Sequence, residues 1–333
     1  MYGIGVVYFI TVAASMRAIQ TANCYHIEGY NAACTHGNIT TYMLMYGAVQ
    51  IVASLIPNFH SIDWLSVIPA IMSFVYSLVG FVLGLANVMC ISTKNGKLKG
   101  SVPGIQVDTQ AKKVWLIFEA FGNIAYAYPY SLLLLEIQIR LSDTLNSPPA
   151  ENKTMKKASM IAISLTTFFY YRCACFGYAA FGNNTPGNIL TGFNEPYWLI
   201  GIANACVILH LVGDIRYSAV FAFVESWFAN FSKCGLMNII KLPLLPPLEL
   251  SLFRLLFRTA YVASTTAVAI LFTYFNHILA IYFPVEMCFV QKNVETWTRK
   301  WIALRAFSFF CLIISIVGLI GSVEGLISAK LKG

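Results

Sequence analysis

The stretch "EAFGNIAYAYPY", Glu119 to Tyr130, decides how this chain is interpreted. It lies within an apolar run, residues 114–136, that is about as long as a bilayer span. Yet it contains an acid, a Gly-Asn pair, three tyrosines and a proline. A helix that only had to cross lipid has no use for these residues, because lipid favours unbroken helices whose backbone groups are all satisfied internally. The stretch therefore predicts a specialised, interrupted helix.

The composition of the chain is that of an integral membrane protein. Its 333 residues are 58% hydrophobic and only 11% charged, with a mean hydropathy of +0.68. Soluble domains are about a quarter charged. The net charge of +8 forms no basic stripe, so the lysines and arginines are interpreted as topology signals in loops. The expected surroundings are a lipid bilayer, and nucleic acid is excluded as a partner.

Uncharged apolar runs predict an all-α protein with nine spans, since a bilayer needs about 20 helical residues per crossing. The runs are 2–19, 42–57, 64–92, 114–136, 158–181, 197–224, 257–273, 274–291 and 301–328. The region 257–291 is ambiguous, being too long for one span and short for two. Because the loops are brief except at 93–113 and 225–256, residues 1–333 are expected to form a single transmembrane domain.

The positions of lysine and arginine predict the orientation of the spans. Inside loops carry more of them if loop 20–41 is extracellular and loop 225–256 is cytosolic, although the five lysines of 93–113 oppose this. The sequons at Asn38 and Asn183 then fall outside and are candidates for glycosylation. Cys24 and Cys34 share the first outside loop, and a disulfide is expected between them if that loop is extracellular.

The interrupted helix is the candidate substrate site. Gly122 supplies a flexible point, and Pro129 removes a helical hydrogen bond about two turns later. Broken helices in transporters expose N–H and C=O groups that can bind a charged solute. The alternative is a kinked helix whose tyrosines pack against neighbouring helices. The candidate substrate-binding residues are Gly122, Asn123, Ala125, Tyr126, Tyr128 and Pro129.

Ionisable residues within spans are costly and are candidates for function. Glu119, His210 and Asp214 are therefore candidates for proton coupling. Glu119 can also be interfacial, and His210 and Asp214, which share a helix face four residues apart, can also be a structural pair. The sequence contains no GxSxG or HExxH motif and no phosphate-binding loop, so an enzyme is not expected. No metal or cofactor is expected beyond a coupling proton.

Several long strings resemble plant amino acid permeases of the amino acid/auxin permease family. They include "MRAIQTANCYH", "IDWLSVIPAIMSFVYS", "SPPAENKTMKKAS", "CFGYAAFGNNTPGNILTGF", "EPYWLIGIANACVILHLVG", "KLPLLP", "YFPVEM" and "IGSVEGLISAK". The resemblance implies proton-coupled symport of amino acids at the plasma membrane and a leucine-transporter-type inverted-repeat helix bundle. It also implies that 114–136 is the sixth family span, a discontinuous helix, and that the chain corresponds to family spans 3–11.

The chain also departs from the family pattern. Family spans one and two have no counterpart, Asn123 stands where the family has aspartate, and the segment after Gly213 is shorter by two residues. Arg172 replaces an uncharged family position, and "IRLS", 139–142, is an insertion. Two functions are therefore kept open. The first is a proton-coupled amino acid importer. The second is a non-transporting paralogue or decayed fragment that can act by associating with intact relatives.

Overall fold

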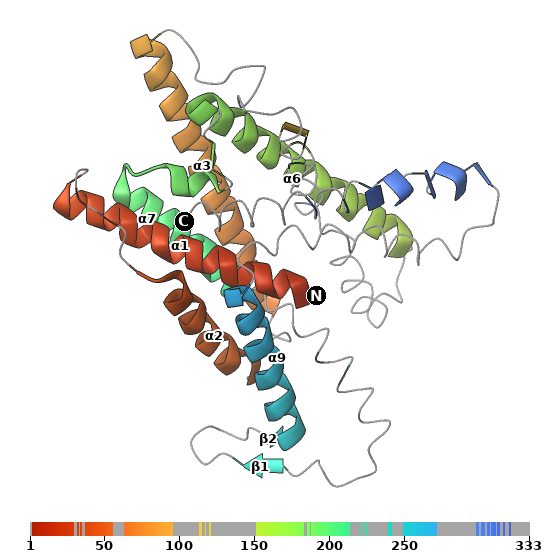
Figure 1. The fold of residues 1–333 in the computed structure, drawn as a ribbon. Helices are drawn as coiled ribbons and strands as arrows, with labels where there is room; N and C mark the ends of the chain where they lie inside the picture. Colours follow the sequence, from red (N-terminus) through yellow and green to blue (C-terminus); the bar gives the residue numbers. More distant parts are fainter. Residues whose placement is uncertain are drawn as a thin grey trace. The chain divides into compact units, whose positions relative to one another are not determined.

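The computed structural model describes residues 2–29, 32, 34, 37–55, 63–95, 151–182, 185–186, 188–213, 239–241 and 249–271, and scattered positions in 113–120, 221–224 and 298–320. The chain divides into two compact units, Met1–Gly104 with Leu145–Leu271, and Ile105–Thr144 with Phe272–Gly333. The helices and strands labelled in Figure 1 belong to the first unit.

The first unit is a helix bundle (Figure 1). Its elements are α1 Tyr2–Glu28, α2 Ile39–Leu55, α3 Asp63–Asn95, α6 Glu151–Phe181, the 3₁₀ turn η3 Ile189–Gly192, α7 Tyr197–Gly213, β1 Ile239–Lys241, β2 Glu249–Ser251 and α9 Leu252–Leu271. Helix α7 packs against α1 and α3, α3 packs against α6, and α2 packs against α1 and α9. This arrangement confirms the prediction of a helical membrane protein.

Three described helices are long and apolar enough to cross a membrane, at Tyr2–Glu28, Val67–Cys90 and Lys156–Phe181. Shorter apolar helices cover Ile39–Ser54, Tyr197–Val212 and Trp301–Phe310. Each of these helices overlaps a run that the sequence predicted to be a span. The remaining predicted spans lie largely outside the described residues, so the count of nine and the inverted repeat stay predictions.

Two segments expected to be loops contain regular structure. Helix α1 continues to Glu28, which shortens the connection that the sequence placed at 20–41. In the segment 225–256, β1 and β2 pair antiparallel, with Ile239 opposite Ser251 and Lys241 opposite Glu249. The β-branched isoleucines of β1 favour a strand.

A glycine sets the distance between α2 and its two neighbours. A Cβ atom at Gly47 would lie 3.0 Å from Oγ1 of Thr266 in α9 and 3.4 Å from Cε1 of Phe9 in α1. The Phe9 ring packs edge-on against Tyr46, with centroids 4.9 Å apart. Small residues allow such close approach, and van der Waals packing is the main attraction between helices in lipid.

Helices α3 and α6 also meet at a glycine. A Cβ atom at Gly84 would lie 3.2 Å from Cβ of Phe176 and 3.6 Å from the backbone nitrogen of Gly177. Arg172, four residues before Phe176 on α6, lies over the Phe168 ring at 3.8 Å and near the Phe81 ring at 5.4 Å. The charge that the sequence places within a span is thus held against aromatic faces.

One end of the bundle is closed by an apolar cluster. Ala22 of α1, Leu83 of α3, Ile200 of α7 and Phe193 of the segment before α7 are all buried there. The Phe193 ring packs on Phe181 with centroids 4.8 Å apart. This cluster fixes the segment that leads into α7 against three helices.

Candidate transport site

The structure describes only part of the site that the sequence predicts. The candidate substrate segment Gly122–Pro129 lies outside the described residues, as do Glu119, Asp214 and the sequon residue Asn183. Of the candidates for proton coupling, His210 is described, on α7.

His210 links α7 to α3. Its Nδ1 lies 2.8 Å from the carbonyl oxygen of Pro69, and its half-buried ring lies edge-on to Tyr76 at 5.8 Å. A carbonyl oxygen only accepts hydrogen bonds, so Nδ1 must carry the hydrogen. In the neutral ring this leaves Nε2 as the nitrogen with a free lone pair. The hydrogen bond that links His210 to α3 therefore uses Nδ1 and leaves Nε2 out of that contact.

A buried polar chain joins α2 to the same part of α7. The Tyr46 hydroxyl donates to the backbone carbonyl of Leu211 at 3.1 Å, and Nε2 of Gln50 donates to the Tyr46 oxygen at 2.6 Å. Both side chains are only 1% exposed. Leu211 follows His210 in sequence, so two neighbouring residues of α7 are bonded by side chain or backbone to two different helices.

Within the part of the chain that the structure describes, some buried oxygen atoms of this bundle accept no hydrogen bond. Among the described residues, Oγ of Ser15 in α1, Oε1 of Gln50 in α2 and Oδ1 of Asn204 in α7 are buried without a hydrogen-bond partner. Polar atoms inside proteins are almost always satisfied by protein groups, water or a ligand. Each of these three oxygen atoms can therefore accept a hydrogen bond that the described protein groups do not supply.

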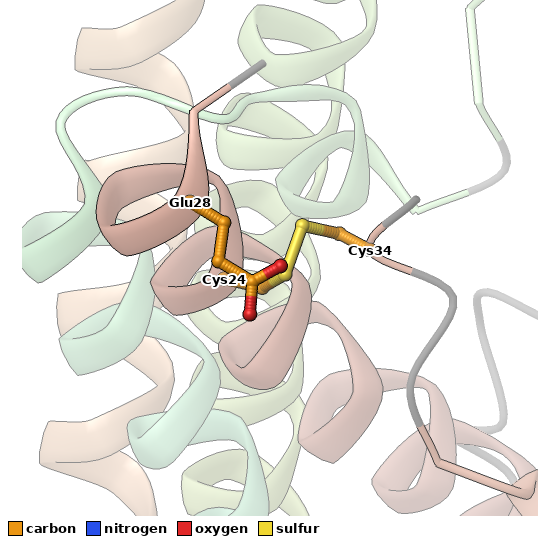
Figure 2. A group of neighbouring side chains, drawn as sticks. All are labelled: Cys24, Glu28 and Cys34. Carbon is orange, nitrogen blue, oxygen red and sulfur yellow. A yellow bond between two sulfur atoms is a disulfide. The ribbon is translucent and has the colours of Figure 1, made fainter. Parts of the chain in front are cut away.

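Cys24 and Cys34 are joined in the structure (Figure 2). Their sulfur atoms are 2.05 Å apart, their Cα atoms are 5.8 Å apart, and the bond links the last turns of α1 to the connection before α2. The Glu28 carboxylate lies within 4.8 Å of the sulfurs. Although two cysteines and an acid are a familiar metal-binding set, a disulfide offers no thiolate to a metal.

Asn38 makes hydrogen bonds at the start of α2, in addition to being a predicted glycosylation site. Its side-chain oxygen accepts a hydrogen bond from the Thr40 backbone nitrogen at 3.1 Å, and its carbonyl accepts from Thr41 at 2.9 Å. Asn38 directly precedes α2 and so acts as its N-cap. The side chain is exposed, which leaves the amide nitrogen accessible to a glycan.

Sequence reasoning missed the polar chain on α2. Tyr46 and Gln50 are four residues apart and share one helix face, a spacing that could have identified them as a pair. It could not have identified Leu211 as the partner, because that contact joins residues 165 positions apart. The N-cap at Asn38 could have been predicted, because an asparagine directly before an apolar helix is a typical capping residue.

Comparison with known proteins shows what this bundle is related to. A family model described as "Transmembrane amino acid transporter protein" matches residues 1–328. "Probable amino acid permease 7" of Arabidopsis thaliana is 47% identical over 352 residues, which cover 99% of this chain and 74% of the relative. "Amino acid permease 3" and "Amino acid permease 1" of the same plant are 42% and 43% identical, over 98% and 99% of this chain and 71% and 70% of theirs. These relatives are named as permeases rather than enzymes. The chain belongs to the transmembrane amino acid transporter family.

Proposed function

We propose that this protein imports amino acids across the plasma membrane in symport with protons. The observation that carries the proposal is the similarity of 98–99% of the chain to proteins named as amino acid permeases. The apolar helices and the buried polar side chains on α1, α2 and α7 support it, because a carrier needs both a lipid-facing exterior and polar groups within the membrane.

The proposed substrate contacts are the backbone groups of Gly122–Pro129, with Asn123, Tyr126 and Tyr128 as side-chain partners. An interrupted helix offers N–H groups to a carboxylate and C=O groups to an ammonium, so one break can bind both ends of an amino acid. No cofactor is required for this step. The coupling ion is the proton.

The proposed proton carrier is His210, with Asp214 and Glu119 as further candidates. The link from Nδ1 to Pro69 holds the ring between α3 and α7, so a charge gained at Nε2 would act where two helices meet. One proton moving inward across 100 mV releases about 2.3 kcal/mol, which can support roughly fortyfold accumulation.

The test is uptake by the purified full chain in proteoliposomes. A labelled neutral amino acid is added outside, with the outside acidic and the inside electrically negative. We expect accumulation above equilibrium that a protonophore abolishes. Uptake that ignores the proton gradient would contradict coupling while leaving transport intact. No uptake by a folded, correctly inserted protein would contradict transport and favour the alternative, a relative that acts by associating with intact permeases.

A further inference from the structure

A cavity lies at the end of the bundle that carries the disulfide. Its volume is about 400 Å³, and it is lined by His26 near the end of α1 and by residues 194–198, where the chain enters α7. Cavities that bind small metabolites have volumes of about 300–1,000 Å³. The size therefore suits a molecule such as a small amine or an amino acid.

The walls of this cavity are held in place from several directions. The His26 ring stacks on Tyr197, with centroids 3.7 Å apart and planes 16° apart. On either side of residues 194–198, Phe193 and Ile200 are buried in the apolar cluster described above. The backbone nitrogens of residues 199 and 200 both donate to the Pro196 carbonyl. The cavity is thus built on fixed elements rather than on a free loop.

The lining groups favour one kind of ligand. Among the described residues they comprise the Glu195 carboxylate, the Asn194 amide and the rings of His26, Tyr197 and Trp198, with no lysine or arginine. Trp198 lines the cavity and is 56% exposed, so much of its side chain can be reached by a ligand. A carboxylate next to aromatic faces binds organic cations through a charge-assisted hydrogen bond and cation–π attraction.

We propose that this cavity binds a primary ammonium group, with Glu195 as its counter-ion and Trp198 as its aromatic wall. The ammonium can come from a free amine or from an amino acid. The proposal uses only the described lining residues and does not depend on the proposed transport function. It would collect amines at the surface of the protein, and its occupancy can be measured by binding alone.

The experiment is saturation-transfer difference NMR on the full chain in lipid nanodiscs, a method suited to weak binding. The probes are 1,5-diaminopentane, which has two ammonium groups and no carboxylate, norleucine, which has one of each, and glutarate, which has only carboxylates. We expect the diamine to bind best and glutarate to give no response. Glutarate binding as well as the diamine would overturn the proposal.

Three variants test the assigned residues. Glu195→Gln should weaken diamine binding about fivefold, the upper range for an exposed ion pair, and Trp198→Leu about threefold, through loss of cation–π attraction. Glu28→Gln removes the same charge two residues from His26 but outside the lining, and should change binding by less than about twofold.

The outcomes that would contradict the proposal are as follows. Equal affinity of the diamine for wild type and Glu195→Gln would overturn it, provided that the two proteins have the same melting temperature. Unchanged binding in Trp198→Leu would also overturn it and would leave Trp198 as a membrane-interface anchor. A norleucine response that is also lost in Glu195→Gln assigns the site to amino acids as well as free amines.

Discussion

Nδ1 of His210 lies 2.8 Å from the carbonyl oxygen of Pro69, so the one described candidate for proton coupling is also a link between α7 and α3. The two roles use different ring nitrogens and can be separated by mutation. Asparagine carries its amide N–H on Cγ, the same carbon that bears Nδ1 in histidine, so it can replace the donor at Nδ1, but it does not titrate.

We therefore predict that His210→Asn keeps its thermal stability and loses the stimulation of uptake by external acid. His210→Ala loses both, since it removes the hydrogen bond to Pro69 at a cost of about 1 kcal/mol. The measurements are uptake against external pH and the melting temperature in detergent. Acid stimulation that persists in His210→Asn would move the coupling role to another group, with Asp214 the next to test.

Gly47 and Gly201 form a matched pair for testing the packing of α2. A Cβ atom at Gly47 would lie 3.0 Å from Oγ1 of Thr266, whereas one at Gly201 would have no neighbour within 4 Å. Alanine is favoured over glycine inside a helix by about 1 kcal/mol. Gly201→Ala should therefore raise the melting temperature, and Gly47→Ala should lower it or leave it unchanged because the contact offsets that gain. Thr266→Ala should remove the penalty of Gly47→Ala in the double variant. Equal gains at both glycines would show that α2 and α9 do not approach this closely.

Asn38 allows the helix cap to be separated from the glycosylation site. Asn38→Asp keeps an oxygen that can accept from the Thr40 nitrogen but destroys the sequon, and Thr40→Ala also destroys the sequon while leaving Asn38 in place. Asn38→Ala removes both and should cost about 1 kcal/mol of stability. The measurements are the melting temperature of protein expressed without glycosylation and the gel mobility of protein from a glycosylating host. If Asn38→Ala melts like Asn38→Asp without a glycan, the cap contributes nothing.

The helices could be predicted from sequence wherever a single local property of a segment was enough to identify it. Apolar runs located α1, α2, α3, α6, α7 and α9, because the lack of charge over about 20 residues is a local property. The ends were less predictable. Residues 20–28 contain polar groups and a glutamate, yet they remain helical in α1, where Ala22 packs into the apolar cluster. That burial depends on Ile200 and Leu83, which no local pattern reveals.

One part of the candidate site could likewise be predicted from sequence, and another part could not. His210 could be selected from sequence because an ionisable group in an apolar run is unusual. Its carbonyl partner and the Tyr46–Leu211 bond could not, because backbone acceptors look alike in any sequence. The cavity lined by Glu195 and Trp198 went unrecognised for a related reason. Its residues are common at membrane interfaces, and only the structure shows that His26 of α1 stacks on Tyr197 of α7.

The Cys24–Cys34 bond should stabilise the end of α1. It joins residues 10 positions apart, and closing a loop of that size stabilises the folded state by about 2.5–3 kcal/mol in the chain-entropy model. We predict that the double variant Cys24→Ser/Cys34→Ser melts at a lower temperature than wild type, and that reductant lowers the melting temperature of wild type only. The exposed thiol of Cys90 serves as the control for labelling. A membrane-permeant maleimide should modify Cys90 without reductant, and Cys24 and Cys34 only after reduction. Labelling of Cys24 in untreated protein would contradict the disulfide.

Arg172 poses the question of whether a charge within a span is tolerated or useful. Its guanidinium lies 3.8 Å from the Phe168 ring centroid, and the side chain is exposed on α6. A buried cation–π contact contributes about 2 kcal/mol, whereas an arginine at the centre of a span costs about 2.5–3.5 kcal/mol on insertion scales. The cost exceeds the gain, so Arg172→Met should be neutral or stabilising by about 1 kcal/mol. Phe168→Leu should destabilise wild type more than it destabilises Arg172→Met, because the ring protects the charge only while the charge is present. Melting temperatures of the four proteins measure this coupling. If Arg172→Met instead lost more than about 1 kcal/mol, the arginine would have to be stabilised by more than the two aromatic rings.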